Sequence, residues 1–328
     1  MVQAAAVLRR PAEWRLLAGL VGCVAVVLVA GRALGAARSA TVETFVLIFT
    51  SIVVEALPFI LLGALVSALI EVYVPERAFV RIARLPAALQ IPGAALGGLA
   101  FPVCECGSVP VSRRLIAKGM HPAAGLAFML ASPILNPIVL LSTYIAYRGR
   151  GLGLEMIAGR AALGLILAVA AGWALGGTSA GELLRPRPTA HGHAGPRRAA
   201  FVEHLAADFF FMGRFVVVGS ALAAALQTTI PQSLVAGVAR TPLVGSLALM
   251  GIAFVLSLCS EADAFVAVSF VQFPIGSQLA FLVFGPVVDA KLAFLYGATF
   301  RRRFVARLIV VALPVCLAGS LWFEALLR

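Results

Sequence analysis

Two short clusters of cysteine and carboxylate residues lie inside apolar stretches of the sequence. The first is Cys104-Glu105-Cys106, and the second holds Cys259, Glu261 and Asp263. Thiols are ligands for thiophilic ions such as Zn(II), Cu(I) or trivalent arsenic, and a nearby carboxylate can take up a proton. We therefore interpret all six as candidate binding residues, with Cys104, Cys106 and Cys259 as the candidate metal ligands.

Each cluster also has a plainer interpretation. A free cysteine behaves as a small hydrophobic residue, so Cys104 and Cys106 could be fillers where backbones approach closely. Glu261 and Asp263 could lie at an aqueous vestibule and only solvate the fold. Acids inside a membrane-like stretch favour the binding interpretation, because an ionised acid at the bilayer centre costs about 2.5–3.5 kcal/mol and usually faces a cavity or a partner.

A second matched pair of motifs follows the clusters. Ser132-Pro-Ile-Leu-Asn136-Pro137 corresponds to Gly285-Pro-Val-Val-Asp289, with Lys291 just beyond. Asn136 and Asp289, together with carbonyls freed by the prolines, could line a polar path and bind the same ligand. The alternative is proline-kinked helix packing, with Asp289 and Lys291 as an internal ion pair.

Prolines and a glycine beside these motifs predict interruptions in the helices. Proline removes a helix donor, and glycine permits backbone angles that other residues avoid. The predicted helix breaks are Pro102, Gly107, Pro110, Pro133, Pro137 and Pro286.

The elements that carry these residues are predicted to be membrane-spanning helices. The 328 residues are 62% hydrophobic and only 12% charged, so the sequence has too few charged residues to cover the surface of a soluble protein. A spanning helix needs about 20 mostly apolar residues. Segments of that kind lie near 16–36, 44–73, 88–112, 122–147, 152–177, 208–229, 242–270, 277–298 and 304–326.

The net charge of +12 indicates membrane lipid rather than nucleic acid as the partner. Arginine and lysine lie mostly in short runs beside apolar segments, where the positive-inside bias and lipid phosphates explain them. The charged residues Glu55, Arg160 and Arg214 fall inside apolar segments and could be mutual partners.

An internal repeat organises the chain. Cys106 aligns with Cys259, Pro133 aligns with Pro286, and Gly63 aligns with Gly219. The positive-inside rule expects more arginine and lysine in the loops on the cytoplasmic side than in those on the outer side. This asymmetry is larger if 88–112 and 242–270 are re-entrant or broken segments than if both cross the membrane. The two segments would then enter from opposite faces. The predicted fold is an all-α polytopic membrane protein of two inverted repeats. Its divisions are 1–43 (cytoplasmic start and first span), 44–177 (first repeat), 178–205 (polar linker) and 206–328 (second repeat).

The chain resembles a known family in both halves. The runs are FPVCECGSVPVSRRL at 101–115, AFMLASPILNP at 127–137, LSLCSEADAFVA at 256–267 and LAFLVFGPVVDAK at 279–291. They resemble the predicted permeases of the YraQ and YcgR type, which are related to the ArsP organoarsenical efflux permeases. The resemblance implies a multi-pass permease of the bacterial inner (plasma) membrane and a second, separately encoded permease subunit; a homo-oligomer is a further possible assembly.

The leading hypothesis is a secondary transporter or permease subunit for a small solute. A thiophilic or divalent metal ion, or a metalloid, fits the cysteine and carboxylate residues best. The alternatives are a non-transporting sensor or scaffold subunit of a two-protein permease and, less favoured, an intramembrane thiol or metal-dependent enzyme. No Gly-x-x-x-x-Gly-Lys-Ser/Thr motif is present, so nothing in the sequence predicts nucleotide coupling, and no cofactor is expected.

Overall fold

The computed structural model describes residues 40–75, 86–99, 103–177, 180–186, 197–229, 241–301 and 303–327. The predicted first span near 16–36 lies outside the described residues. In the described part the regular structure is helical, apart from one isolated antiparallel bridge between Leu184 and Phe300. The helices are α3 (Ala40–Tyr73), α5 (Ala87–Gly97), α6 (Glu105–Ala117), α7 (Pro122–Leu135), α8 (Pro137–Arg148), α9 (Gly153–Leu175), α10 (Ala180–Leu183), α11 (Arg197–Thr229), α13 (Pro242–Leu256), α14 (Asp263–Ala267), α15 (Ile275–Phe284), α16 (Ala290–Thr299) and α17 (Phe304–Leu326).

Several helices are suited to a bilayer. Within the described residues, α3, α7 with α8, α9, α11 and α17 give five stretches long and apolar enough to cross a membrane. Their outer faces carry exposed large apolar side chains, such as Leu47 (70% exposed) and Trp322 (69%). Such faces are stable against lipid tails and unfavourable in water. The prediction of an all-α polytopic membrane protein is confirmed.

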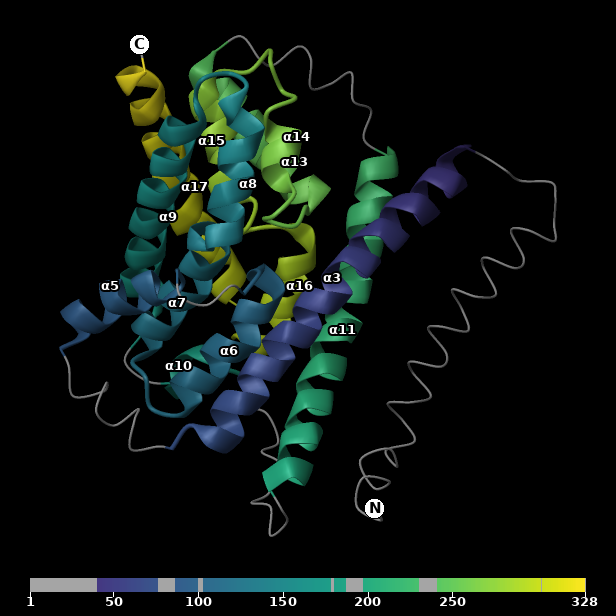
Figure 1. Ribbon diagram of the computed structural model, residues 1–328, viewed down its shortest axis with the longest axis vertical. Coiled ribbons are helices and arrows are strands. Elements are labelled where there is room, and N and C mark those ends of the chain that lie inside the picture. Colours follow the sequence, from purple (N-terminus) through teal and green to yellow (C-terminus); the bar gives the residue numbers. More distant parts are fainter. Residues whose placement is uncertain are drawn as a thin grey trace.

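The order of helices repeats along the chain. A long helix, a broken segment, a second broken segment and a single helix make up α3 to α9, and the same order recurs from α11 to α17. In Figure 1 the helices α5, α6 and α7 gather at the lower end, whereas α13, α14 and α15 gather at the upper end. Opposite ends are what inverted repeats would produce, and the inversion itself stays a prediction.

The two long helices bring the halves together. α3 and α11 pack against each other along one side of the bundle (Figure 1). α3 also contacts α6, and α11 contacts α16, so each long helix supports a short helix that carries site residues. Helix α11 begins at Arg197, inside the stretch predicted as the linker 178–205, because Arg197–Leu205 continues the helix of the following apolar segment.

The breaks in the helices differ in position from the predicted ones. Gly107 and Pro110 do not break a helix: both lie inside α6, and the interruption precedes Cys104. Pro133 likewise lies inside α7, near its end. Helices inside a membrane tolerate proline where neighbouring groups satisfy the freed carbonyl.

Two predicted breaks coincide with interruptions, and one is not described. Pro137 is the first residue of α8, where its missing N–H would have no partner in any case. Pro286 lies in the turn between α15 and α16. Pro102 lies outside the described residues.

Candidate functional site

The first half contributes Glu105 at the start of a helix. Cys104 has an extended backbone (φ −70°, ψ 174°), and α6 begins at the next residue, so Glu105 occupies the first turn. The positive end of a helix dipole favours a carboxylate there. Glu105 is nevertheless 1% exposed, so it requires partners inside the protein.

The second half contributes a compact turn between α13 and α14. Helix α13 ends at Ser257, a non-glycine residue with a left-handed backbone (φ 47°). The backbone N–H groups of Ala262 and Asp263 then donate to the carbonyl of Cys259, at 3.0 and 3.1 Å. This turn directs residues 259–261 toward the first half.

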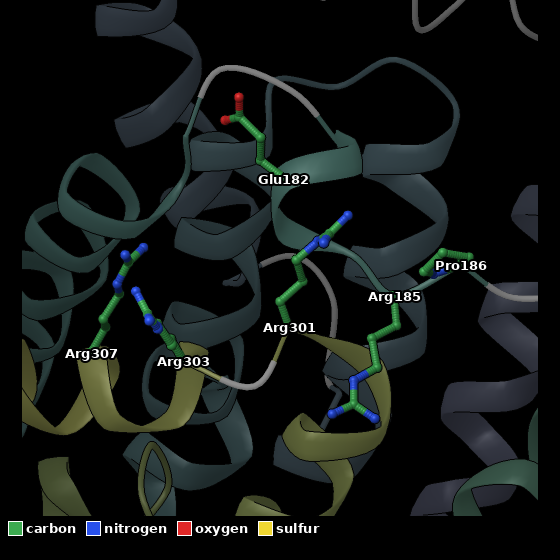
Figure 2. Close-up of a pocket in the computed structure, with 6 residues that line it drawn as sticks. All are labelled: Glu182, Arg185, Pro186, Arg301, Arg303 and Arg307. Atoms are coloured by element: carbon green, nitrogen blue, oxygen red, sulfur yellow. The ribbon is translucent and has the colours of Figure 1, made fainter.

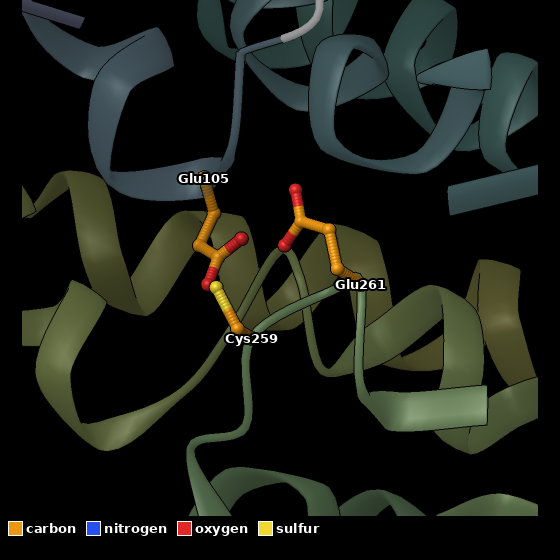
Figure 3. A group of neighbouring side chains, drawn as sticks. All are labelled: Glu105, Cys259 and Glu261. Carbon is orange, nitrogen blue, oxygen red and sulfur yellow. The ribbon is translucent and has the colours of Figure 1, made fainter. Parts of the chain in front are cut away.

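Three ligand-type side chains from the two halves meet at this point. Ligand atoms of Glu105, Cys259 and Glu261 all lie within 4.8 Å of one another (Figure 3). Glu105 and Cys259 are buried, and Glu261 is partly buried. The Oε1 atom of Glu261 is buried without a hydrogen-bond partner. We call Glu105, Cys259 and Glu261 the thiol–carboxylate trio.

Lys291 and Ser260 complete the surroundings of Glu105. The Lys291 ammonium lies 2.9 Å from Glu105 Oε1 and 3.7 Å from Asp289 Oδ2. The Ser260 hydroxyl lies 3.0 Å from Glu105 Oε2 and 3.4 Å from Glu261 Oε2. Sequence reasoning paired Lys291 with Asp289 but missed its contact with Glu105. Its position inside an apolar segment was the available signal.

Asp263 lies beside the trio but serves another partner. Both of its carboxylate oxygens accept from the Arg160 guanidinium, at 2.9 and 2.7 Å, and both side chains are buried. Arg160 also donates to Thr143 Oγ1 at 2.8 Å. The sequence left open whether Arg160, Arg214 and Glu55 are mutual partners. Arg160 pairs with Asp263 instead, and Arg214 is exposed and lies over the rings of Phe211 and Phe215.

Asn136 and Asp289 have the same structural role in the two halves. Asn136 Oδ1 accepts from the N–H of Ile138 at 2.9 Å and caps α8. Asp289 Oδ1 accepts from the N–H of Leu292 at 2.6 Å and caps α16. These caps satisfy backbone donors at the second helix of each broken span. Asp289 Oδ2, which has no hydrogen bond, remains directed at Lys291.

The other two cysteines of the predicted metal set lie near the trio but are not part of the group whose ligand atoms meet within 4.8 Å. Cys104 and Cys106 are buried free thiols. The structure groups Cys259 with two carboxylates rather than with these thiols.

The buried charges do not balance. Glu105, Glu261, Asp263 and Asp289 face only Lys291 and Arg160 as cationic neighbours among the ion pairs in the described residues. Four acids against two bases leave a negative surplus when all are ionised. A protein interior offsets such a surplus with protons or with a bound cation.

Comparisons with known proteins show the family of this chain. A family described as predicted permease matches residues 41–324. The protein YcgR of Bacillus subtilis (strain 168) is 42% identical over 281 residues, which cover 84% of this chain and 95% of that protein. A Streptococcus mutans protein, named provisionally as a subunit of a two-component membrane permease complex, is 33% identical over 270 residues, covering 80% and 89%. No solved structure gives a significant match. The resemblance read from the motifs is therefore confirmed, and this chain belongs to the predicted permease family.

Proposed function

We propose that this permease moves a metal cation through the thiol–carboxylate trio. The observation that carries the proposal is the meeting of Glu105 from the first half with Cys259 and Glu261 from the second, inside a membrane protein. In transporters built from repeats, substrate sites lie at the repeat interface near the midplane. A site shared between halves can open to either side as the halves move.

The donor set favours a borderline divalent cation such as Zn(II). All-thiolate sets suit Cu(I) and trivalent arsenic, whereas carboxylates suit harder ions, and zinc accepts both ligand types. Ligand atoms around a tetrahedral zinc lie under about 4 Å apart, so the trio needs only small side-chain movements to close on an ion. Three protein ligands leave a position for water or a further group, as suits transient binding.

Lys291 supplies a countercharge within the site. Its ammonium nitrogen lies 2.9 Å from Glu105 Oε1, where an arriving cation would bind. Asp289 Oδ2, at 3.7 Å and without a hydrogen bond, offers a second position for the ammonium. We infer that the bound ion displaces the Lys291 ammonium from Glu105 toward Asp289. When the ion leaves, the ammonium pairs with Glu105 again, so Glu105 is never an unpaired buried carboxylate.

Zinc flux into vesicles containing the purified chain tests the proposal. Cys259→Ala and Glu261→Gln should each lower flux at least tenfold, because each removes one of three ligands. Cys316→Ala is the matched control, since Cys316 is a fully buried thiol on α17. If zinc is transported and all three variants transport it equally, the trio is not the path.

A second candidate function is that of a permease subunit that requires a partner. The Streptococcus mutans relative is named as a subunit of a two-component complex. In that case the trio would bind the cation, and translocation would need the second protein. Measurable zinc binding, lost in Glu261→Gln, without flux by the chain alone would favour this candidate; flux by the chain alone would exclude it.

A further inference from the structure

Four arginines surround an open cavity that is lined by none of the trio residues. Arg185, Arg301, Arg303 and Arg307 line it together with Pro186 and a single acid, Glu182, and its volume is about 480 Å³ (Figure 2). In Figure 2 the Glu182 carboxylate is directed away from the four guanidinium groups. None of the four arginines has an ion-pair partner within the described residues.

The backbone holds this arginine pocket in place. The segment after α10 and the segment before α17 form the bridge between Leu184 and Phe300. Its hydrogen bonds run from Arg185 N to Thr299 O at 3.0 Å and from Arg301 N to Leu183 O at 3.1 Å. The pocket therefore joins the start of the linker to the loop between α16 and α17 in the second half.

Two of the guanidinium groups are oriented by carbonyl oxygens. Arg301 donates to Gly181 O at 3.0 and 2.8 Å, and Arg185 Nε donates to Phe300 O at 2.9 Å. Carbonyls fix the direction of a guanidinium without neutralising its charge. The remaining donors of a planar guanidinium suit phosphate, which it can bind in a bidentate manner.

The pocket lies at the boundary of the predicted membrane. Arg303 precedes α17, a candidate span that begins at Phe304, and the helix N-terminus adds to the positive field. About two turns further along α17, Val310 is 71% exposed. Near the end of the neighbouring α9, Trp173 is 65% exposed, as is common for tryptophan at the headgroup level.

We propose that the arginine pocket binds the phosphate headgroup of an anionic phospholipid. The arginines would hold the phosphate, and the exposed apolar face of α17 would accept the acyl chains. The positive-inside bias places this end of the molecule in the cytoplasmic leaflet, which carries anionic lipid. Because the pocket is shared by the linker and the second half, a bound lipid would tie the linker to that half.

Native mass spectrometry of the full chain, purified in detergent, tests the proposal. After mixing with equal amounts of phosphatidylglycerol and phosphatidylcholine, the wild type should retain phosphatidylglycerol. Arg303→Gln with Arg307→Gln should weaken this retention by about 30-fold, since each basic residue near an anionic surface is worth about 1 kcal/mol. Arg148→Gln replaces an exposed arginine in the last turn of α8 that does not line the pocket, and this variant should retain as much as the wild type.

Separate arms distinguish the sources of the anion. Competition by inorganic phosphate at millimolar concentration should displace little lipid, because free phosphate lacks the apolar contacts. Equal retention by wild type and the double glutamine variant, or equal retention of the two lipids, would overturn the proposal. Tight binding of inorganic phosphate without a preference between the lipids would overturn the proposal as well. It would also be overturned if neither lipid bound and only an acidic protein partner occupied the pocket.

Discussion

At the scale of single residues, buried charges join the two halves of the molecule. Glu105 and Arg160 belong to the first half, and their partners Lys291 and Asp263 belong to the second. Removing one member of a buried pair typically costs 3–5 kcal/mol, because the other charge is left without compensation. These pairs therefore hold the halves in register while placing charge beside the trio.

Lys291 is the residue at which cargo and protein compete in the proposed mechanism. Lys291→Gln should raise the affinity for zinc about tenfold or more, because the ammonium no longer occupies Glu105. The same change should lower zinc flux, because the site would release its ion more slowly. Without the Lys291 ammonium, the site would also lack a countercharge once the ion has left. Isothermal titration gives the affinity, and vesicle uptake gives the flux.

The other lysine provides the control for this prediction. Lys118 donates to the carbonyls of Ile70 and Glu71 at the end of α3, at 2.8 and 2.7 Å. Lys118→Gln should reduce stability without changing zinc affinity. Weaker zinc binding by Lys291→Gln than by the wild type would contradict the competition.

At the scale of elements, two glycines at equivalent positions of the repeats allow close helix packing. A Cβ at Gly63 of α3 would collide with the backbone of Gly107 in α6. A Cβ at Gly219 of α11 would lie 2.5 Å from the Cα of Lys291 in α16. Small residues let membrane helices approach in this way, and each contact here supports a helix that carries site residues.

Gly219→Ala should destabilise the protein, by about 1–3 kcal/mol as for other overpacked cores. It should also lower zinc flux, because α16 and Lys291 must shift. Gly213→Ala on the same helix is the matched control: a Cβ there meets nothing within 4 Å, so helix propensity should raise stability by up to about 1 kcal/mol. Thermal unfolding in detergent compares the two, and equal melting temperatures would contradict the packing argument.

Helix boundaries show what the sequence could and could not predict. Apolar length and proline content were enough to predict the spans and the existence of breaks. They did not reveal that α6 begins at Glu105, so Gly107 and Pro110 were expected to interrupt a helix that they lie within. For the same reason Asn136 and Asp289 were read as lining a path, although each caps a helix, because a cap is defined only once the helix start is known.

At the scale of the whole molecule, the site depends on contacts that local sequence patterns do not contain. Glu105 and Lys291 are 186 residues apart, and Arg160 and Asp263 are 103 apart. Each was visible as a charge in an apolar stretch, but pairing requires the arrangement of helices in space. The trio itself was partly predictable, because its members lie in the two aligned clusters; the exclusion of Cys104 and Cys106 from it was not.

The predicted inversion of the repeats has a consequence for the two sides of the membrane. Ala117 at the end of α6 and Gln272 between α14 and α15 are exposed, and each lies close to the connection between the two broken segments of its half. α6 lies toward the lower end of the molecule and α14 toward the upper end (Figure 1). In inverted repeats these positions face opposite sides of the membrane, whereas in parallel repeats they face the same side.

Single cysteines introduced as Ala117→Cys and Gln272→Cys, in a chain that carries Cys23→Ser, separate these arrangements. A membrane-impermeant maleimide should label only Gln272→Cys in intact cells and both variants in permeabilised cells, because the positive-inside rule places the arginine-rich end of α6 in the cytoplasm. The other native thiols, Cys104, Cys106, Cys259 and Cys316, are buried and should contribute little background. Labelling of both variants from the same side would contradict the inversion, and with it the argument that the two halves present their clusters to one site from opposite faces.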